Sequence, residues 1–268
     1  MFTRLPECAL QLRRGRVSLI AWPVAMSAIL SLYCTVFGAM LDDIKAQQQT
    51  IHEMPEAMQK LFSDNMMSDG ASFVYTVFFS LIGFILLSIA SVTWGQSVVA
   101  GPSDSGELEL SASRGIARAS FLGQRIAAIV LRMVIVGVAI SLVLAGFNGH
   151  SQLGLTAGGE AVAIVGWLGH GALVGAVTNL VGVATLKRSA AIAAGTSVAV
   201  WSYLAQAVGK LLDSLQWMCW LSPQYWIFRD NPLADITATT LWGIVAVWAL
   251  AVGATAASFV LFRRRDLV

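Results

Sequence analysis

The chain has 268 residues, of which 57% are hydrophobic and only 12% are charged, and its net charge is +2. Soluble domains carry about 25% charged residues, so the composition excludes one or two ordinary soluble domains. We expect most of the surface to face lipid or other helices. The small basic excess then indicates membrane topology rather than nucleic-acid binding.

The first 16 residues combine apolar side chains with four arginines. This pattern predicts a basic amphipathic helix over residues 1–16 that lies on the inner leaflet, with a disordered basic leader as the alternative. The apolar run that follows, residues 17–41, is longer than the roughly 7–15 residues of a signal-peptide core. We therefore interpret it as a retained first span.

Six apolar runs approach or exceed the roughly 20 residues that a helix needs to cross a bilayer core about 30 Å thick. Backbone groups in lipid must be satisfied within their own segment, so each run is predicted to be α-helical. The six runs cover residues 17–41, 71–95, 126–147, 161–186, 190–209 and 237–262. The predicted fold class is all-α integral membrane, with residues 1–268 forming a single transmembrane domain.

Basic residues predict the orientation of these spans. One side carries many more of them than the other, and both chain ends fall on that basic side. Its members are Arg4, Arg13, Arg14, Arg16, Arg114, Arg118, Arg125, Lys187, Arg188, Arg263, Arg264 and Arg265. We expect a cytoplasmic (inner) membrane location with both termini in the cytoplasm. Arg132, inside the third span, is expected to snorkel to the inner surface, and a functional charge there is the alternative.

Two segments on the opposite side carry structural signals. In the hydrophilic loop 42–70, Pro55 and its acidic neighbours predict a short helix over 55–62, or else a plain solvated cap. Residues 211–233 are rich in Trp and Tyr and are divided by Pro223 and Pro232. We expect a re-entrant pair of short helices dipping into the outer leaflet before the sixth span; a simple aromatic belt is the alternative.

The charged stretch between the second and third spans is the main candidate for function. Gly101 and Pro102 are expected to end the second span. Asp104 as an N-cap would place Glu107 at the third helical position, which is a capping-box arrangement. The pattern predicts a short helix over 105–112 that could transmit a push between two spans. A capped loop without that role remains the alternative.

These residues resemble a known family. The run DSGELEL (residues 104–110) is similar to the acid-x-Gly-x-Leu-Glu-Leu element of type-2 ABC exporter permeases. Arg118 and LGQR (122–125) resemble the motifs that follow it, and LSPQYW (221–226) resembles the family's outer loop before the sixth span. Gly115 stands where the family often has a proline, which loosens the expected turn.

The resemblance implies a half-transporter with a cytoplasmic coupling segment over residues 103–119. Two such permeases, either two copies or a related pair, would join two cytoplasmic ABC ATPase subunits that bind ATP and Mg. This chain has no GxxxxGK[ST] motif, so it is not expected to be an enzyme or to bind a cofactor itself. The residues expected to contact the ATPase are Glu107, Leu108, Glu109, Arg114 and Arg118.

Inside the predicted spans, hydroxyl groups form two thin polar stripes. Ser27, Ser31 and Thr35 recur at every fourth residue of the first span, and Tyr75 and Ser80 lie near the outer end of the second. We expect these stripes to face the substrate path or a dimer seam. Hydrogen bonding of each hydroxyl to its own helix is the alternative.

Other polar residues in the spans are expected to be structural. His170 is interpreted as a packed, hydrogen-bonded residue rather than a proton relay, and Asn179 as a bond between helices. Gly171, Gly175 and Asn179 share a face and predict close helix packing. The cysteines have no metal-binding spacing, so no metal is expected, and the sequence does not support a Cys34–Cys219 disulfide.

The sequence therefore predicts the permease subunit of an ATP-driven ABC exporter that moves a hydrophobic or amphiphilic substrate, such as a drug-like molecule, a lipid or a peptide. An ATP-independent secondary carrier is disfavoured because no Asp, Glu or Lys lies deep in a span. A membrane-embedded enzyme is disfavoured because no HExxH-like cluster occurs. Both remain alternatives.

Overall fold

The computed structural model describes residues 6–52, 69–106, 117–151 and 153–264. These ranges contain helices and their connections, without a strand. Six helical segments within them are long and apolar enough to cross a membrane. The predicted all-α fold with six spans is confirmed.

Each predicted run forms part of a long helical segment. The six segments are α2 (Arg16–His52), the continuous series α4, η2 and α5 (Gly70–Gln96), α8 (Arg118–His150), α9 (Ala157–Thr185), α10 (Arg188–Leu211) and α12 (Ala238–Arg264). Helix α2 continues to His52, so the expected loop from residue 42 begins later than predicted. The stretch after Leu41 contains Ala, Gln and Lys without Gly or Pro, which favours continued helix.

The second span is not a uniform α-helix. It starts as α4 (Gly70–Val74), where Asp69 caps the helix by accepting a 2.6 Å hydrogen bond from the Ser72 amide. It continues as the π-helix η2 (Tyr75–Ile82) and returns to α-helix in α5 (Gly83–Gln96). π-helical stretches are rare and are frequent at functional sites.

Helix α9 lies at the centre of the bundle and packs against α5, α10 and α12. The predicted small-residue face makes this possible: a Cβ atom on Gly171 would lie 2.8 Å from Leu87 on α5. Two turns further along α9, the Asn179 amide donates a 3.1 Å hydrogen bond to the Ser258 hydroxyl of α12. The predictions of close packing and of an interhelical bond at Asn179 are confirmed.

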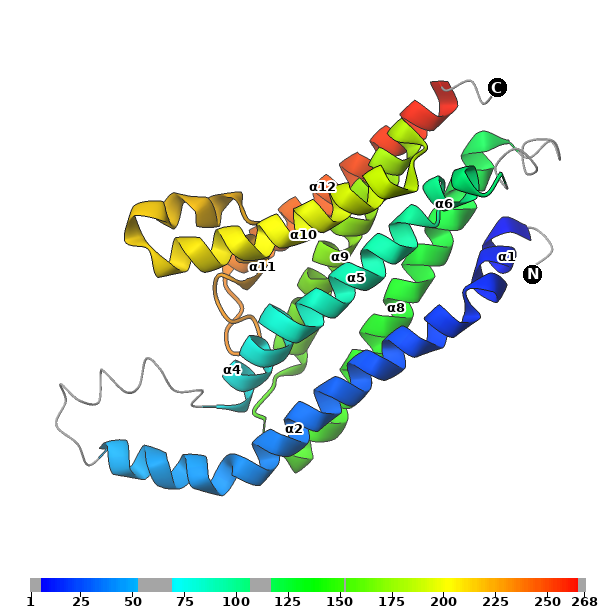
Figure 1. The fold of residues 1–268 in the computed structure, drawn as a ribbon. Coiled ribbons are helices and arrows are strands. Elements are labelled where there is room, and N and C mark those ends of the chain that lie inside the picture. The colour runs from blue at the N-terminus through cyan, green and yellow to red at the C-terminus, as the bar shows by residue number, and fades with distance from the viewer. Residues whose placement is uncertain (1–5, 53–68, 107–116, 152, 265–268) are drawn as a thin grey trace.

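Helices α2 and α8 run side by side along one flank, and α1 (Pro6–Arg14) packs on α8 (Figure 1). Of the helix predicted over residues 1–16, the structure describes the helical part Pro6–Arg14, whereas its position at a membrane surface stays a prediction. The start of α1 and the end of α12 lie at the same end of the bundle (Figure 1). We call it the arginine-rich end, because Arg125, Arg188 and Arg264 belong to it.

Two short helices join α10 to α12, as the prolines predicted. They are η3 (Asp213–Leu221), a 3₁₀-helix, and α11 (Pro223–Phe228). Ser222 divides them: its hydroxyl accepts from the Tyr225 amide at 3.2 Å and donates to the Ser202 carbonyl of α10 at 2.5 Å. Their insertion into a leaflet stays a prediction, and the expected helices over 55–62 and 105–112 lie outside or largely outside the described residues.

Candidate functional site

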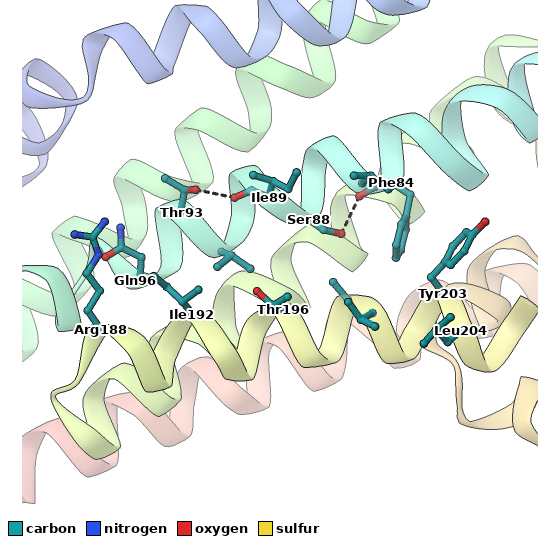
Figure 2. A pocket seen from close by; sticks show the side chains of 14 residues that line it. Phe84, Ser88, Ile89, Thr93, Gln96, Arg188, Ile192, Thr196, Tyr203 and Leu204 are labelled. Atoms are coloured by element: carbon teal, nitrogen blue, oxygen red, sulfur yellow. Dashed lines mark hydrogen bonds between the residues drawn. The ribbon is translucent and has the colours of Figure 1, made fainter.

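An apolar groove of about 450 Å³ runs between α5 and α10 (Figure 2). This volume lies within the ~300–1,000 Å³ typical of small-molecule sites. Its walls are aliphatic and aromatic, and its outer edge is open: Ile89 of α5 and Val200 of α10 are both about half exposed. In a membrane, such an edge would face lipid or a second protein.

The two hydroxyl groups that α5 brings to the groove donate hydrogen bonds to their own helix. Ser88 donates a 2.8 Å hydrogen bond to the Phe84 carbonyl, and Thr93 donates one of 2.8 Å to the Ile89 carbonyl (Figure 2). Each of these hydroxyls has used its one proton and can offer a ligand only its acceptor lone pairs. The groove therefore presents an apolar surface along most of its length, suited to an aliphatic or aromatic group.

A second, polar cavity of about 350 Å³ joins the groove at the arginine-rich end. The two cavities share Thr93, Gln96 and Arg188. Figure 2 shows Arg188 and Gln96 together at one end of the groove, with Tyr203 toward the other. The polar cavity extends from there between α1, α5, α6 (Ala100–Asp104) and α8. Together they form one cleft with an apolar limb and a cationic limb.

Arg125 of α8 fastens the bend that ends the second span. Its Nη1 atom donates to the carbonyl oxygens of Ser97 and Val98 at 3.2 and 3.3 Å. These carbonyls belong to the turn after α5, and the last carbonyls of a helix have no donor within it. The guanidinium supplies that donor, and its positive charge interacts favourably with the negative end of the helix dipole. The guanidinium also lies 4.4 Å from the ring centroid of Phe121.

Arg132 does not snorkel to the surface as expected. Only 4% of the residue is exposed, and its Nη2 atom donates a 3.0 Å hydrogen bond to the Gln11 carbonyl in the last turn of α1. Gly15, immediately after α1, leaves room for the guanidinium, because a Cβ there would collide with it. The sequence could not place α1 against α8, so this contact was missed.

The segment after the second span also differs from expectation. Gly101 and Pro102 do not end a helix but lie inside α6, and Asp104 is its last residue rather than an N-cap. Proline is tolerated in the first turn of a helix, because no intrahelical acceptor exists there for the N–H that it lacks. The true break is one turn earlier, at the Ser97–Val99 bend that Arg125 holds.

Most of the predicted coupling residues cannot be placed. Glu107, Leu108, Glu109 and Arg114 lie outside the described residues, and Arg118 is the first residue of α8. Arg125 joins α8, which follows these residues, to the bend that precedes α6.

The predicted hydroxyl stripe of the first span does not line the groove. Ser27 and Ser31 are half-buried, Thr35 is exposed, and Thr35 donates a 2.8 Å hydrogen bond to the Ser31 carbonyl. None of the three lines either limb of the cleft. For Thr35, the alternative of a hydrogen bond to its own helix describes what the structure shows.

Tyr75 and Ser80 of the second span both contact the connection between α10 and α12. The Tyr75 hydroxyl donates a 2.6 Å hydrogen bond to the Phe228 carbonyl, and the Ser80 carbonyl accepts one of 2.9 Å from Gln224. Ser80 also lines a smaller cavity of about 240 Å³ with Gln206 and Lys210 of α10. The structure thus brings Ser80, but not Tyr75, to a cavity.

His170 is fully buried, as expected, but neither ring nitrogen has a hydrogen-bond partner among the described residues. Its ring packs on Phe84 with the centroids 4.4 Å apart. Its packing role agrees with the prediction, and the expected hydrogen bond is wrong. Cys34 and Cys219 are both free.

Six helices that can cross a membrane, with an open cleft along two of them, define the chain as a multi-pass helical membrane protein. Residues 7–263 match the family described as "Multidrug efflux system permease Rv1217c, C-terminal domain", and the chain belongs to this family. No curated protein and no solved structure gave a significant match.

Proposed function

We propose that this chain is the permease subunit of an ATP-driven ABC exporter in the cytoplasmic membrane. The family to which it belongs is described as a multidrug efflux permease, which supports a drug-like or amphiphilic cargo. The ATP-binding subunits would be separate polypeptides, two per complex, and would carry ATP and Mg. Two permease subunits, identical or related, would complete the transporter.

The observation that carries this proposal is the fastened bend between α5 and α6. Arg125 ties the bend to α8, and the Gln11 amide of α1 donates a 3.3 Å hydrogen bond to the Ser97 hydroxyl. One turn earlier, the Trp94 indole donates a 3.0 Å hydrogen bond to Ser18 of α2. A displacement of the segment that follows α6 would therefore be transmitted to three neighbouring helices, α1, α2 and α8.

The groove between α5 and α10 is the proposed cargo path. Its apolar walls suit the cargo, and α5, which forms one of these walls, also packs against the central helix α9. A rigid-body motion of α5 would change the groove width directly. Arginines at the same end of the bundle support an inward-facing arginine-rich end.

Co-purification of the tagged full chain tests the coupling step. We expect a soluble ATPase to be retained, and we expect the double charge reversal E107K/E109K to reduce its retention at least about fivefold, because a buried or partly buried charge contact is lost. Lys187→Glu is the matched control, since Lys187 is exposed and lines neither cavity. Equal retention in all three proteins would contradict the proposed contact.

A further inference from the structure

The cationic limb of the cleft carries unused hydrogen-bonding capacity. Arg132 is 4% exposed and its Nε atom is buried without a partner among the described residues. Gln11 and Gln96 are each 8% exposed, and each has a buried Oε1 atom without a partner there. Buried polar groups are normally satisfied, so these three atoms require an explanation.

Among the described residues, the charged side chains that line this limb are all basic. Arg125, Arg132 and Arg188 all line it, and no Asp or Glu is among the described residues that do so. Arg132 and Arg188 form no salt bridge with a described carboxylate. Three guanidinium groups around one cavity of about 350 Å³ attract an anion, because arginine forms strong charge-assisted bonds with phosphate and carboxylate.

The unpaired amide oxygens restrict the ligand further. Guanidinium groups need acceptors, whereas the Oε1 atoms of Gln11 and Gln96 need donors. A group that satisfies both is an anion that also carries hydroxyl groups, such as a polyol phosphate. Basic pockets between membrane helices are known to bind such lipid headgroups.

The apolar limb supplies the second half of the recognition. It starts where the cationic limb ends, at Gln96 and Arg188 (Figure 2), and runs along α5 and α10 toward Tyr203. Its open edge allows a molecule to enter sideways from a leaflet. A headgroup at the arginines would place its chain in this groove.

We propose that the cleft binds an anionic, hydroxyl-bearing amphiphile, with its headgroup in the cationic limb and its apolar chain between α5 and α10, and that this amphiphile belongs to the exporter's cargo class. Only the cargo assignment rests on the proposed function. Binding needs neither ATP nor a partner, so a failure of binding and a failure of export are separate results.

The headgroup test uses the purified full chain and dioctanoyl phosphatidylglycerol, with binding measured by native mass spectrometry. We expect Arg188→Gln to weaken binding about five- to tenfold by removing a charge-assisted contact, and Arg188→Lys to restore part of it. Lys187→Gln removes the same charge from the adjacent exposed position and should change nothing. Equal effects of the glutamine variants at 187 and 188, or equal binding of dioctanoyl phosphatidylcholine, would overturn the proposal.

The second experiment asks whether the acyl chain of the lipid lies in the apolar limb, by filling that limb with a larger side chain. Thr196 is exposed and lines the groove, whereas the adjacent Ser197 is exposed and does not. We expect Thr196→Trp to weaken phosphatidylglycerol binding about tenfold by occupying the groove, and Ser197→Trp to leave it unchanged. If Thr196→Trp instead changes the oligomeric state and spares lipid binding, a second copy covers the groove and the proposal is wrong.

The last arm separates cargo from a resident lipid. In vesicles that hold the full transporter, a fluorescent phosphatidylglycerol in the nucleotide-facing leaflet should move to the other leaflet when ATP is added, and Arg188→Gln should slow this movement. Retention of the lipid despite ATP-driven efflux of another compound would overturn the cargo assignment. Glycerol 3-phosphate alone should bind at least about tenfold more weakly, because it cannot use the apolar limb; equal binding would remove the groove from the site.

Discussion

The two ends of the second span are held in chemically different ways. At the arginine-rich end, a buried guanidinium from α8 and an amide from α1 hold the Ser97–Val99 bend. At the π-helical end, neutral groups make the contacts: the Tyr75 hydroxyl reaches the Phe228 carbonyl and Gln224 reaches the Ser80 carbonyl. Hydrogen bonds tie the first end to α1 and α8, whereas the interhelical hydrogen bonds described for the second end reach the connection between α10 and α12. The second end contacts α2 and α9 through aromatic packing.

This difference separates two roles along one helix. A bend held by charge-assisted bonds in a buried setting moves together with its partners, because breaking those bonds leaves buried groups unpaired. An end held by single neutral bonds can rearrange at lower cost. We therefore interpret the arginine-rich end as the point where force enters and the π-helical end as the part that yields.

The largest expected effect comes from removing the arginine that holds the bend. Arg125→Leu leaves the Ser97 and Val98 carbonyls without their donor and should lower the free energy of unfolding by about 2–5 kcal/mol. Thermal unfolding of the full chain in detergent measures this loss. Arg264→Leu, at an exposed position of α12, should cost less than about 0.5 kcal/mol. A similar cost at both positions would remove the distinction between the two ends.

Next in size is the close approach of α5 to α9, just before the bend. A Cβ atom on Gly95 would lie 2.5 Å from the Gly175 carbonyl oxygen, which is backbone and cannot move alone. Gly95→Ala should therefore cost about 1–3 kcal/mol in the same assay. Gly253→Ala on α12 meets nothing within 4 Å and should be neutral or stabilise by up to about 1 kcal/mol. If the two alanine variants are equally stable, the close packing of α5 on α9 at Gly95 is contradicted.

A smaller effect is expected at the π-helical end. Tyr75→Phe removes one neutral hydrogen bond and should cost about 0.5–1.5 kcal/mol. Tyr33→Phe is the control, because the Tyr33 hydroxyl makes no hydrogen bond with the described residues, and its unfolding curve should not move. If Tyr75→Phe lowers the free energy of unfolding as much as Arg125→Leu does, the two ends of the second span are held equally firmly.

The smallest expected effect is a pH dependence of the folding stability, caused by Asp230 in the connection between α11 and α12. Hydrogen bonds from Thr237 and Thr239, and the charge of Arg229, lower the pKa of Asp230 below its ordinary value of 3.8, against the opposing effect of burial. The carboxylate therefore stabilises the fold above that ordinary value, and this stabilisation is lost as the pH falls through the lowered pKa.

Acidification below about pH 4 should thus lower the melting temperature of the wild type more than that of Asp230→Asn. The difference should be small, because Asp230 is partly exposed. If the melting temperatures of the wild type and of Asp230→Asn fall in parallel from pH 6 to pH 3, this carboxylate does not stabilise the fold.

Much of the fold could be predicted because membrane helices are encoded locally. A run of apolar residues reveals a span, and Gly171, Gly175 and Asn179 at spacing four reveal a packing face. Pro223 likewise marked the start of α11. None of these inferences needs knowledge of which helices are neighbours.

The candidate site was harder to predict because it depends on helices far apart in the chain. The contact between Arg132 and Gln11 spans 121 positions, and the cationic limb exists only where α1, α5, α6 and α8 meet. Arg188 was interpreted only as a topology signal, because the sequence does not show which side chains surround it. The π-helix of the second span has no sequence signal comparable to a proline or a cap.

Efflux from reconstituted vesicles tests the central claim most directly. The purified chain is compared alone, with its co-purified ATPase, and with the ATPase plus ATP, and loss of a fluorescent amphiphile is followed over time. We expect efflux only when both the ATPase and ATP are present, and we expect the E107K/E109K variant to lose it. Efflux by the chain alone, at a rate that neither ATP nor the ATPase changes, would contradict it.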